Sequence, residues 1–183
     1  MMQTFVFLAD GFEEIEAVGI IDVLRRSGME VTVVSISKYS KVVGAHGITV
    51  MADIIFEMAD FSQGQMLVLP GGNPGTQNLD AHKGLKMLIQ QYANQGKYIA
   101  AICAAPMVLG SMNLLRGKRA TVYPGCEEYL KGATIVPDPV VVDGNIITGR
   151  GPGSVFEFAT TLVTEMWGEY RTKELAEGML LQL

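Results

Sequence analysis

The chain has 183 residues, of which 49% are hydrophobic and 18% are charged, and its net charge is −5. This length allows one substantial core and requires no second domain, so we predict a single domain over residues 1–183. The chain is too apolar for disorder and too interrupted by charge for a membrane span, and its acidic balance argues against nucleic acid as the main partner.

The start of the chain carries no export signal, because an apolar stretch follows Met1 and Met2 without a charged leader or a cleavage site. We therefore predict a cytoplasmic protein, in which Cys103 and Cys126 stay as thiols, although two cysteines also suffice for one disulfide. They form no C-x-x-C pair, and the chain has only two histidines, so the sequence predicts no metal site.

Apolar runs of strand length alternate along the chain with longer stretches of helical period. This alternation is typical of βαβ units and predicts an α/β fold with a mainly parallel sheet and helices on both faces. In chain order, the predicted strands are 4–9, 30–36, 66–69 and 97–102, with hairpins that pair 41–43 with 48–51 and 140–142 with 146–148. The predicted helices are 13–27, 80–94 with Asp80 as its cap, 104–112, 155–167 and 172–181.

Three segments of unusual composition follow predicted strands, namely residues 10–14, 71–73 and 103–105. In an open parallel sheet, ligands bind outside the carboxyl ends of the strands, at the point where strand order reverses. We therefore expect these three segments to meet in one crevice that carries the chemistry.

Cys103 lies at an abrupt junction between a predicted strand and a predicted helix, among small alanines that let the backbone turn sharply. Such a turn is typical of a nucleophile elbow, and the N–H groups of the following helix favour a thiolate over a thiol that titrates near ~8.5. The alternative is a small buried apolar residue, as most free cysteines are. Cys126 has no comparable setting, and we interpret it as structural.

Glu16 is the next informative residue, because at ~100° per residue its direction falls close to Leu24, within the apolar stripe of its helix. A carboxyl buried there has a raised pKa and can exchange a proton with Cys103. The alternative is a carboxylate at the rim of the stripe. Glu14 is predicted to point away from this face, and Glu13 to complement the helix dipole.

Gly71 and Gly72 follow a predicted strand and offer backbone N–H groups suited to an oxyanion, the alternative being a flexible loop. A nucleotide site is disfavoured, because no G-x-G-x-x-G follows the first strand and no P-loop lysine is present.

Five blocks of sequence occur in the order LADGFEEIE at 8–16, VLRRSG at 23–28, LPGGN at 69–73, IAAICAAP at 99–106 and RGPG at 150–153. Together they resemble the ThiJ/PfpI superfamily, whose domain is similar to class I glutamine amidotransferases, and most closely the branch of the parkinsonism-associated deglycase, called DJ-one. The resemblance covers nearly the whole chain.

The resemblance implies a flavodoxin-like homodimer in which Cys103 is the nucleophile, Glu16 its carboxylate partner, and the N–H groups of Gly72 and Ala104 hold an oxyanion or a sulfinate. It implies a glyoxalase or deglycase that acts on methylglyoxal or its early adducts without a cofactor and protects against oxidative stress. Members are also described as chaperones with an oxidisable cysteine, which is the second reading. A purely structural or partner-binding module is the third.

One departure concerns Tyr123, which stands where the branch has its catalytic histidine, since a phenol that titrates near ~10 is a poor base at neutral pH. Ala104 stands where the peptidase branch has a histidine, which disfavours proteolysis. Arg26 and Arg150 match arginines near the family's dimer interface, the alternative being a solvated surface. His46 and His82 are predicted to be exposed and receive no role.

Overall fold

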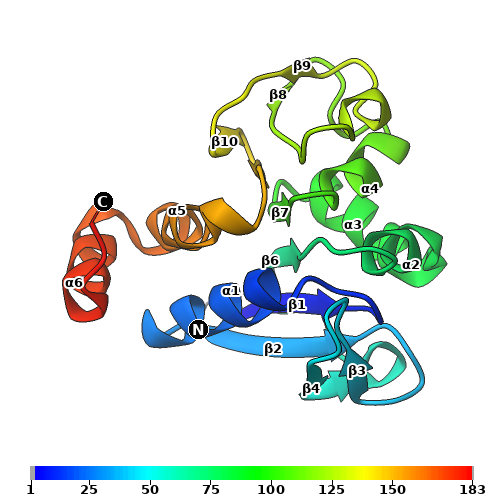
Figure 1. Cartoon of the computed structure of the whole chain (residues 1–183), viewed down its shortest axis with the longest axis horizontal. Helices are drawn as coiled ribbons and strands as arrows, with labels where there is room; N and C mark the ends of the chain where they lie inside the picture. The colour runs from blue at the N-terminus through cyan, green and yellow to red at the C-terminus, as the bar shows by residue number, and fades with distance from the viewer. Residues whose placement is uncertain (1–2, 183) are drawn as a thin grey trace.

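The computed structural model of the chain describes residues 3–182 and has three layers, with helices on both faces of one seven-stranded sheet (Figure 1). Met1, Met2 and Leu183 lie outside the described residues. The prediction that no export signal stands at the start of the chain, and both ends of the predicted domain 1–183, therefore fall partly outside them. The strands, in their order across the sheet, are β10 (Val140–Asp143), β11 (Ile146–Gly149), β7 (Tyr98–Ile102), β6 (Gly64–Leu69), β1 (Gln3–Leu8), β2 (Glu30–Ser35) and β5 (Ile54–Ile55).

All neighbouring pairs in this sheet are parallel except β10 with β11, which forms the predicted antiparallel hairpin. The predicted α/β class with a mainly parallel sheet is therefore confirmed. Strand order reverses at β1, which lies between β2 and β6, so the crevice expected at such a switch point opens beyond the carboxyl ends of β1 and β6.

The described residues form six helices: α1 (Glu14–Arg26), α2 (Gly75–Ala81), α3 (Lys83–Asn94), α4 (Pro106–Ser111), α5 (Val155–Trp167) and α6 (Glu169–Met179), the last of which packs against α5. Two apolar clusters lie between these layers. One joins the sheet to α1 and α5, with Leu175 of α6 at its edge, and the other joins the sheet to α2, α3 and α4. Each face of the sheet is thus covered by helices, as a parallel sheet requires.

The continuous apolar run of β1 follows from this arrangement. Val6 and Leu8 point into the cluster under α1 and α5, whereas Phe5 and Phe7 point into the opposite cluster. Successive side chains of a strand alternate between faces, so a strand covered on both sides needs apolar residues at every position. The same rule explains why β6 and β7 were recognisable from sequence.

Two small sheets lie outside the main one. The predicted hairpin of β3 (Lys41–Val43) and β4 (Thr49–Met51) is confirmed as antiparallel, but it forms a sheet of its own. β8 (Arg119–Ala120) and β9 (Thr134–Ile135) pair in parallel. The sequence did not predict β5, β8 or β9, because a strand of two residues is too short to show the alternation of apolar and polar side chains. Short 3-10 helices occupy Phe56–Met58, Glu127–Tyr129 and Pro152–Ser154.

The predicted cap at Asp80 is wrong. The stretch 80–94 is divided between α2 and α3, and His82 stands between them as the cap of α3, with its Nδ1 accepting a hydrogen bond from the Leu85 N–H at 2.9 Å. The Asp80 carboxylate instead binds Ser111 and Lys86. An imidazole can cap a helix when its acceptor nitrogen faces the free N–H groups of the first turn.

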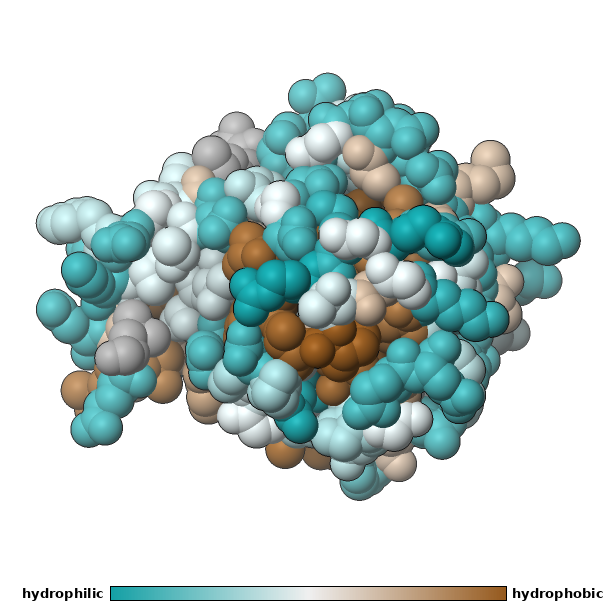
Figure 2. All heavy atoms as spheres, turned by 90° about the horizontal axis from the view of Figure 1, so that it is seen from above, coloured by the Kyte–Doolittle hydropathy of each residue, from teal (hydrophilic) through white to brown (hydrophobic). Residues whose placement is uncertain are grey.

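The surface seen in Figure 2 is largely polar, with an apolar area near its centre that is surrounded by hydrophilic side chains. Among residues 3–182, none of the helices combines the length and the apolar character that crossing a bilayer demands.

Candidate active site

Cys103 directly follows β7 and adopts a left-handed backbone conformation, with φ of 63°. A residue with a Cβ is strained there, and the strain persists only where neighbours fix the backbone. Two hydrogen bonds do so: the Cys103 N–H donates to the Gly149 carbonyl at 2.9 Å, and the Cys103 carbonyl accepts from the Tyr123 N–H at 2.8 Å. The elbow expected at this junction is therefore present in the backbone.

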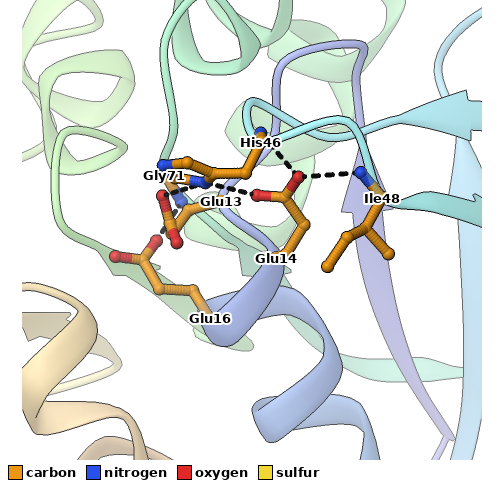
Figure 3. Close-up of polar contacts among 6 residues, drawn as sticks. All are labelled: Glu13, Glu14, Glu16, His46, Ile48 and Gly71. Carbon is orange, nitrogen blue, oxygen red and sulfur yellow. Dashed lines mark hydrogen bonds and ion pairs between the residues drawn. The ribbon is translucent and has the colours of Figure 1, made fainter.

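Glu16 is fully buried in the second half of the first turn of α1, and its side chain turns toward the loop that follows β6 (Figure 3). Its Oε2 accepts a hydrogen bond from the Gly71 N–H at 2.7 Å. Its Oε1 has no hydrogen-bond partner among the described residues. The predicted burial of Glu16 is confirmed, and one carboxyl oxygen remains free for proton exchange.

Gly71 lies between the two groups. A methyl group placed on its Cα would lie 2.7 Å from Cys103 Cβ and 2.8 Å from Glu16 Oε2. Only glycine therefore lets the carboxyl and the thiol approach each other. The sequence singled out the Gly71 and Gly72 pair for its N–H groups, but it did not reveal that position 71 separates acid from thiol.

Burial raises the pKa of Glu16 to about 7, and the charge of Glu13 adds to the rise, whereas hydrogen bonds from Gly71 and Cys103 oppose it. Burial also raises the pKa of the Cys103 thiol, and the charge and the hydrogen bond of Glu16 add to that rise. The predicted thiolate at rest is thus wrong, because burial and the neighbouring carboxylate outweigh the N–H groups of the turn. Glu16 is poised to exchange a proton near neutral pH, with Cys103 as its partner.

The N–H groups of Ala104 and Gly72 donate hydrogen bonds to Cys103 and lower its pKa against the larger opposing effects. They converge on the sulfur from two segments, the residues after β7 and the residues after β6. Cys103 is buried, with 9% of its surface exposed. The expected crevice therefore contains a thiol, a proton-exchanging carboxyl and two N–H donors.

The structure corrects the placement of Glu14, which is buried and does not point to solvent. Its Oε1 accepts hydrogen bonds from the N–H groups of His46 at 2.7 Å and Ile48 at 3.3 Å, and its Oε2 lies 2.8 Å from His46 Nδ1. The helical direction of Glu14 was read correctly, but the β3–β4 hairpin covers that side of α1. His46 is exposed, as expected, yet it is bound to Glu14.

Glu13, Glu14 and His46 are the one group of possible metal ligands within residues 3–182, with their ligand atoms inside 4.8 Å of one another. The Glu14 oxygens in this group already accept hydrogen bonds from His46 and Ile48. The group is therefore explained by bonds within the protein.

The sequence model of the DJ-1/PfpI family matches residues 2–165, most of the chain. The chain belongs to the DJ-1/PfpI family. The predicted resemblance is thus confirmed, and the residues at the crevice are those that the family blocks contain.

Individual relatives agree with this assignment. DJ-1 homolog A of Arabidopsis thaliana is 40% identical over 96% of this chain, and a deglycase of Pyrococcus abyssi is 34% identical over 88% of this chain and 98% of its own length. The solved structure of oxidized Toxoplasma gondii DJ-1 has a TM-score of 0.96 at 34% identity, covering 100% of both chains. The chain spans less than half the length of the Arabidopsis relatives, 45% of homolog A and 40% of homolog B.

The remaining predicted residues of this chain lie around the crevice or beyond it. Tyr123 is 48% exposed and borders, with Arg150, a pocket of about 380 Å³ that Cys103 does not line. Arg26 is exposed and pairs with Asp22 at 2.6 Å. Within the described part of the chain, no hydrogen bond or ion pair joins Arg26 or Arg150 to the acid or the thiol, and the free thiol of Cys126 is half-buried.

Proposed function

We propose that this protein is a cofactor-free, cysteine-dependent glyoxalase or deglycase that acts on methylglyoxal or its early adducts. The observation that carries the proposal is the contact of a thiol, Cys103, with a buried carboxyl, Glu16, that has a pKa of about 7 and one unpartnered oxygen. A group with a pKa near the working pH both accepts and returns a proton readily. The relative from Pyrococcus abyssi, which is named a deglycase, supports the same class of reaction.

The reaction begins with addition of the Cys103 sulfur to the aldehyde carbon of methylglyoxal. Because the thiol is protonated at rest, the Glu16 carboxylate takes its proton as the carbon–sulfur bond forms. The aldehyde oxygen becomes an oxyanion, which the N–H groups of Gly72 and Ala104 stabilise. It then takes the proton from Glu16 to give a hemithioacetal, and Glu16 returns to the carboxylate form.

Glu16 next moves a proton from the former aldehyde carbon to the neighbouring ketone carbon through an enediol. The product is a lactoyl thioester on Cys103, which water hydrolyses to lactate and the free thiol. Methylglyoxal and one water thus give lactic acid, with no oxidant or reductant. In an early adduct with an amine, the Cys103 sulfur attacks the same carbon, the carbon–nitrogen bond breaks, and the leaving nitrogen takes the thiol proton by way of Glu16, which gives the free amine and the same hemithioacetal.

The test is lactate formation from methylglyoxal by the purified protein, compared with Cys103→Ser and with Cys126→Ser as the matched control. We expect turnover in the wild type and in Cys126→Ser, and a loss of at least about 100-fold in Cys103→Ser. Equal turnover in the wild type and Cys103→Ser excludes the mechanism.

A redox-sensing chaperone with little turnover is the second candidate. Tyr123 in the place of the family histidine favours it, as does the unpartnered Glu16 Oε1, which can share a proton with an oxidised Cys103. Mild peroxide followed by intact mass measurement tests it. A gain of two oxygens that is absent from Cys103→Ser supports sensing, whereas oxidation spread over the eleven methionines speaks against it.

We further propose a homodimer, as the family resemblance implies. The outer side of α1 exposes Ile15 and Val18, and α5 exposes Phe156 beside Val155, which faces Gly19 of α1. Exposed apolar side chains on two packed helices are suited to a second copy of the chain. Sedimentation equilibrium of the wild type and of Val18→Asp tests this, and a monomeric wild type contradicts it.

A further inference from the structure

The first turn of α1 carries a carboxyl that the proposed reaction does not use, Glu14, and the β3–β4 hairpin closes over it (Figure 3). We propose that Glu14 and His46 form a clamp that fastens this hairpin to α1 and thereby positions Glu16 for proton exchange with Cys103. His46 is then a positioning residue that acts through the loop it holds. The proposal rests on the proposed function only for the role of Glu16.

The clamp is a set of hydrogen bonds to one buried carboxylate. Both oxygens of Glu14 are engaged, Oε1 by the N–H groups of His46 and Ile48 and Oε2 by the imidazole of His46. A methyl group on Gly44 would collide with this carboxylate, so the tip of the hairpin is shaped around it. A buried carboxylate without these donors would be costly, which makes hairpin and helix depend on each other.

Further bonds tie the hairpin to the loop between β1 and α1. The Gly11 N–H donates to the Val43 carbonyl at 2.7 Å, and the Ala45 N–H donates to the Phe12 carbonyl at 2.8 Å. The Val43 N–H in turn donates to Asp10 Oδ1 at 2.9 Å. Together with the bonds of the clamp, these bonds form one continuous contact between the hairpin and the segment from Asp10 to Glu14.

The same loop contacts the active-site segment after β6 on its other side. The Glu13 N–H donates to the Gly71 carbonyl at 3.0 Å, and the Gly75 N–H donates to the Gly11 carbonyl at 3.1 Å. Gly72 packs so closely on this loop that a side chain there would strike the backbone of Gly11, Phe12 and Glu13. A shift of the loop would consequently displace both Glu16 and the glycines that flank it.

The charges around His46 also connect it with the titration of Glu16. His46 Nδ1 lies 3.7 Å from Glu13 Oε2, and the hydrogen bond to Glu14 and both negative charges raise the pKa of His46. The titratable groups around this imidazole are Glu14 in the first turn of α1 and Glu13 just before it, with Glu16 and Cys103 beyond them and Asp10 at the start of the loop. A cation at His46 offsets the charge of Glu13, which otherwise raises the pKa of Glu16.

His46 can be replaced without leaving a cavity, because its side chain is 68% exposed. The experiment uses His46→Ala, His46→Arg and, as a matched control, His82→Ala, which also removes an imidazole that bonds through its Nδ1, here to the Leu85 N–H at the start of α3 instead of to a carboxylate. Two quantities are measured: the titration of Glu16 by pH-difference infrared spectroscopy, assigned by its absence in Glu16→Gln, and kcat and KM for lactate formation.

We expect His46→Ala to raise the midpoint of the Glu16 titration by roughly half a unit and to lower kcat roughly tenfold with KM nearly unchanged. His46→Arg restores a cation and a donor to Glu14, and both values return toward those of the wild type. His82→Ala changes neither, although it lowers the unfolding midpoint.

A Glu16 titration in His46→Ala that matches the wild type overturns the proposal, as does a His46→Arg variant that behaves like His46→Ala. A kcat in His46→Ala that falls no further than in His82→Ala overturns it too. If the wild type forms no lactate, the proposed function fails, and the infrared titration alone decides whether the clamp acts on Glu16.

Discussion

Glu16 Oε2 and Cys103 Cβ face the same point in space, at 2.8 Å and 2.7 Å from where a methyl group on Gly71 would stand. The carboxyl and the thiol are thus brought together by the absence of a side chain between them. We predict that Gly71→Ala separates them and lowers the turnover of methylglyoxal at least about tenfold, because a displacement of about 1 Å is enough to disrupt proton transfer.

The same substitution should lower the free energy of unfolding by about 2 kcal/mol, since the buried surroundings have no room for the methyl group. Gly153→Ala is the matched control, because nothing lies within 4 Å of its added methyl group. Kinetics and urea unfolding of both variants check the prediction. Full activity in Gly71→Ala would mean that the contact between acid and thiol is not needed.

The raised pKa of Glu16 predicts a specific dependence of stability on pH. Its ordinary value is 4.5 and its folded value is about 7, so the folded chain binds more protons than the unfolded chain between these values. The stability contributed by protonated Glu16 is therefore full below about 4.5 and is lost as the pH rises to about 7, by roughly 3 kcal/mol.

This effect is measured as the difference in unfolding free energy between the wild type and Glu16→Gln, followed by urea unfolding from pH 4 to pH 8. Taking the difference cancels the contributions that the other carboxyl groups make to the pH dependence of stability. Some of these act in the opposite direction, such as Asp143 with its lowered pKa. The wild type should lose stability relative to Glu16→Gln as the pH rises. A difference that stays constant with pH would show that Glu16 titrates normally.

The fold was predictable from sequence wherever an element is long or covered on both faces. Residues 5–8 of β1, 66–69 of β6 and 98–102 of β7 form continuous apolar runs, and the helix 155–167 was predicted with the bounds that α5 has. The short strands β5, β8 and β9 escaped prediction, because their pairing depends on neighbours that are distant along the chain. The same holds for the division between α2 and α3, where an imidazole takes the role of a cap.

The site was predictable where it depends on the direction of a side chain on its own helix or on the local turn of the backbone. The position of Glu16 on the apolar stripe indicated burial, and the junction at Cys103 indicated a strained turn, and both are confirmed. The protonation of Cys103 could not be read, because it depends on how deeply the β7 end is buried beside Glu16. The burial of Glu14 could not be read either, since a hairpin 32 residues further along covers it.

Tyr123 provides a test of how far the absence of the family histidine lowers kcat. Its backbone N–H donates to the Cys103 carbonyl, so the position is fixed beside the backbone of Cys103, while its side chain is 48% exposed. We predict that Tyr123→His raises kcat for methylglyoxal several-fold near pH 7, because an imidazole is a better base there than a phenol. Tyr123→Phe, which removes only the hydroxyl, should leave kcat within about twofold of the wild type. A large loss in Tyr123→Phe would instead assign a role to the phenol.

Gly44 offers a way to open the hairpin clamp without touching a titratable group. A methyl group at this position would collide with the Glu14 carboxylate, whereas Gly178→Ala, on exposed α6, meets nothing within 4 Å. We predict that Gly44→Ala lowers the free energy of unfolding by about 1 to 3 kcal/mol, because Glu14 must leave its donors or the hairpin must move. The pKa of Glu14, now held below its ordinary value by hydrogen bonds from His46 and Ile48 that outweigh its burial, should rise as those bonds are lost. Carboxyl carbon NMR titration follows this change, and a Glu14 pKa that stays low in Gly44→Ala would show that the hairpin adapts around the methyl group.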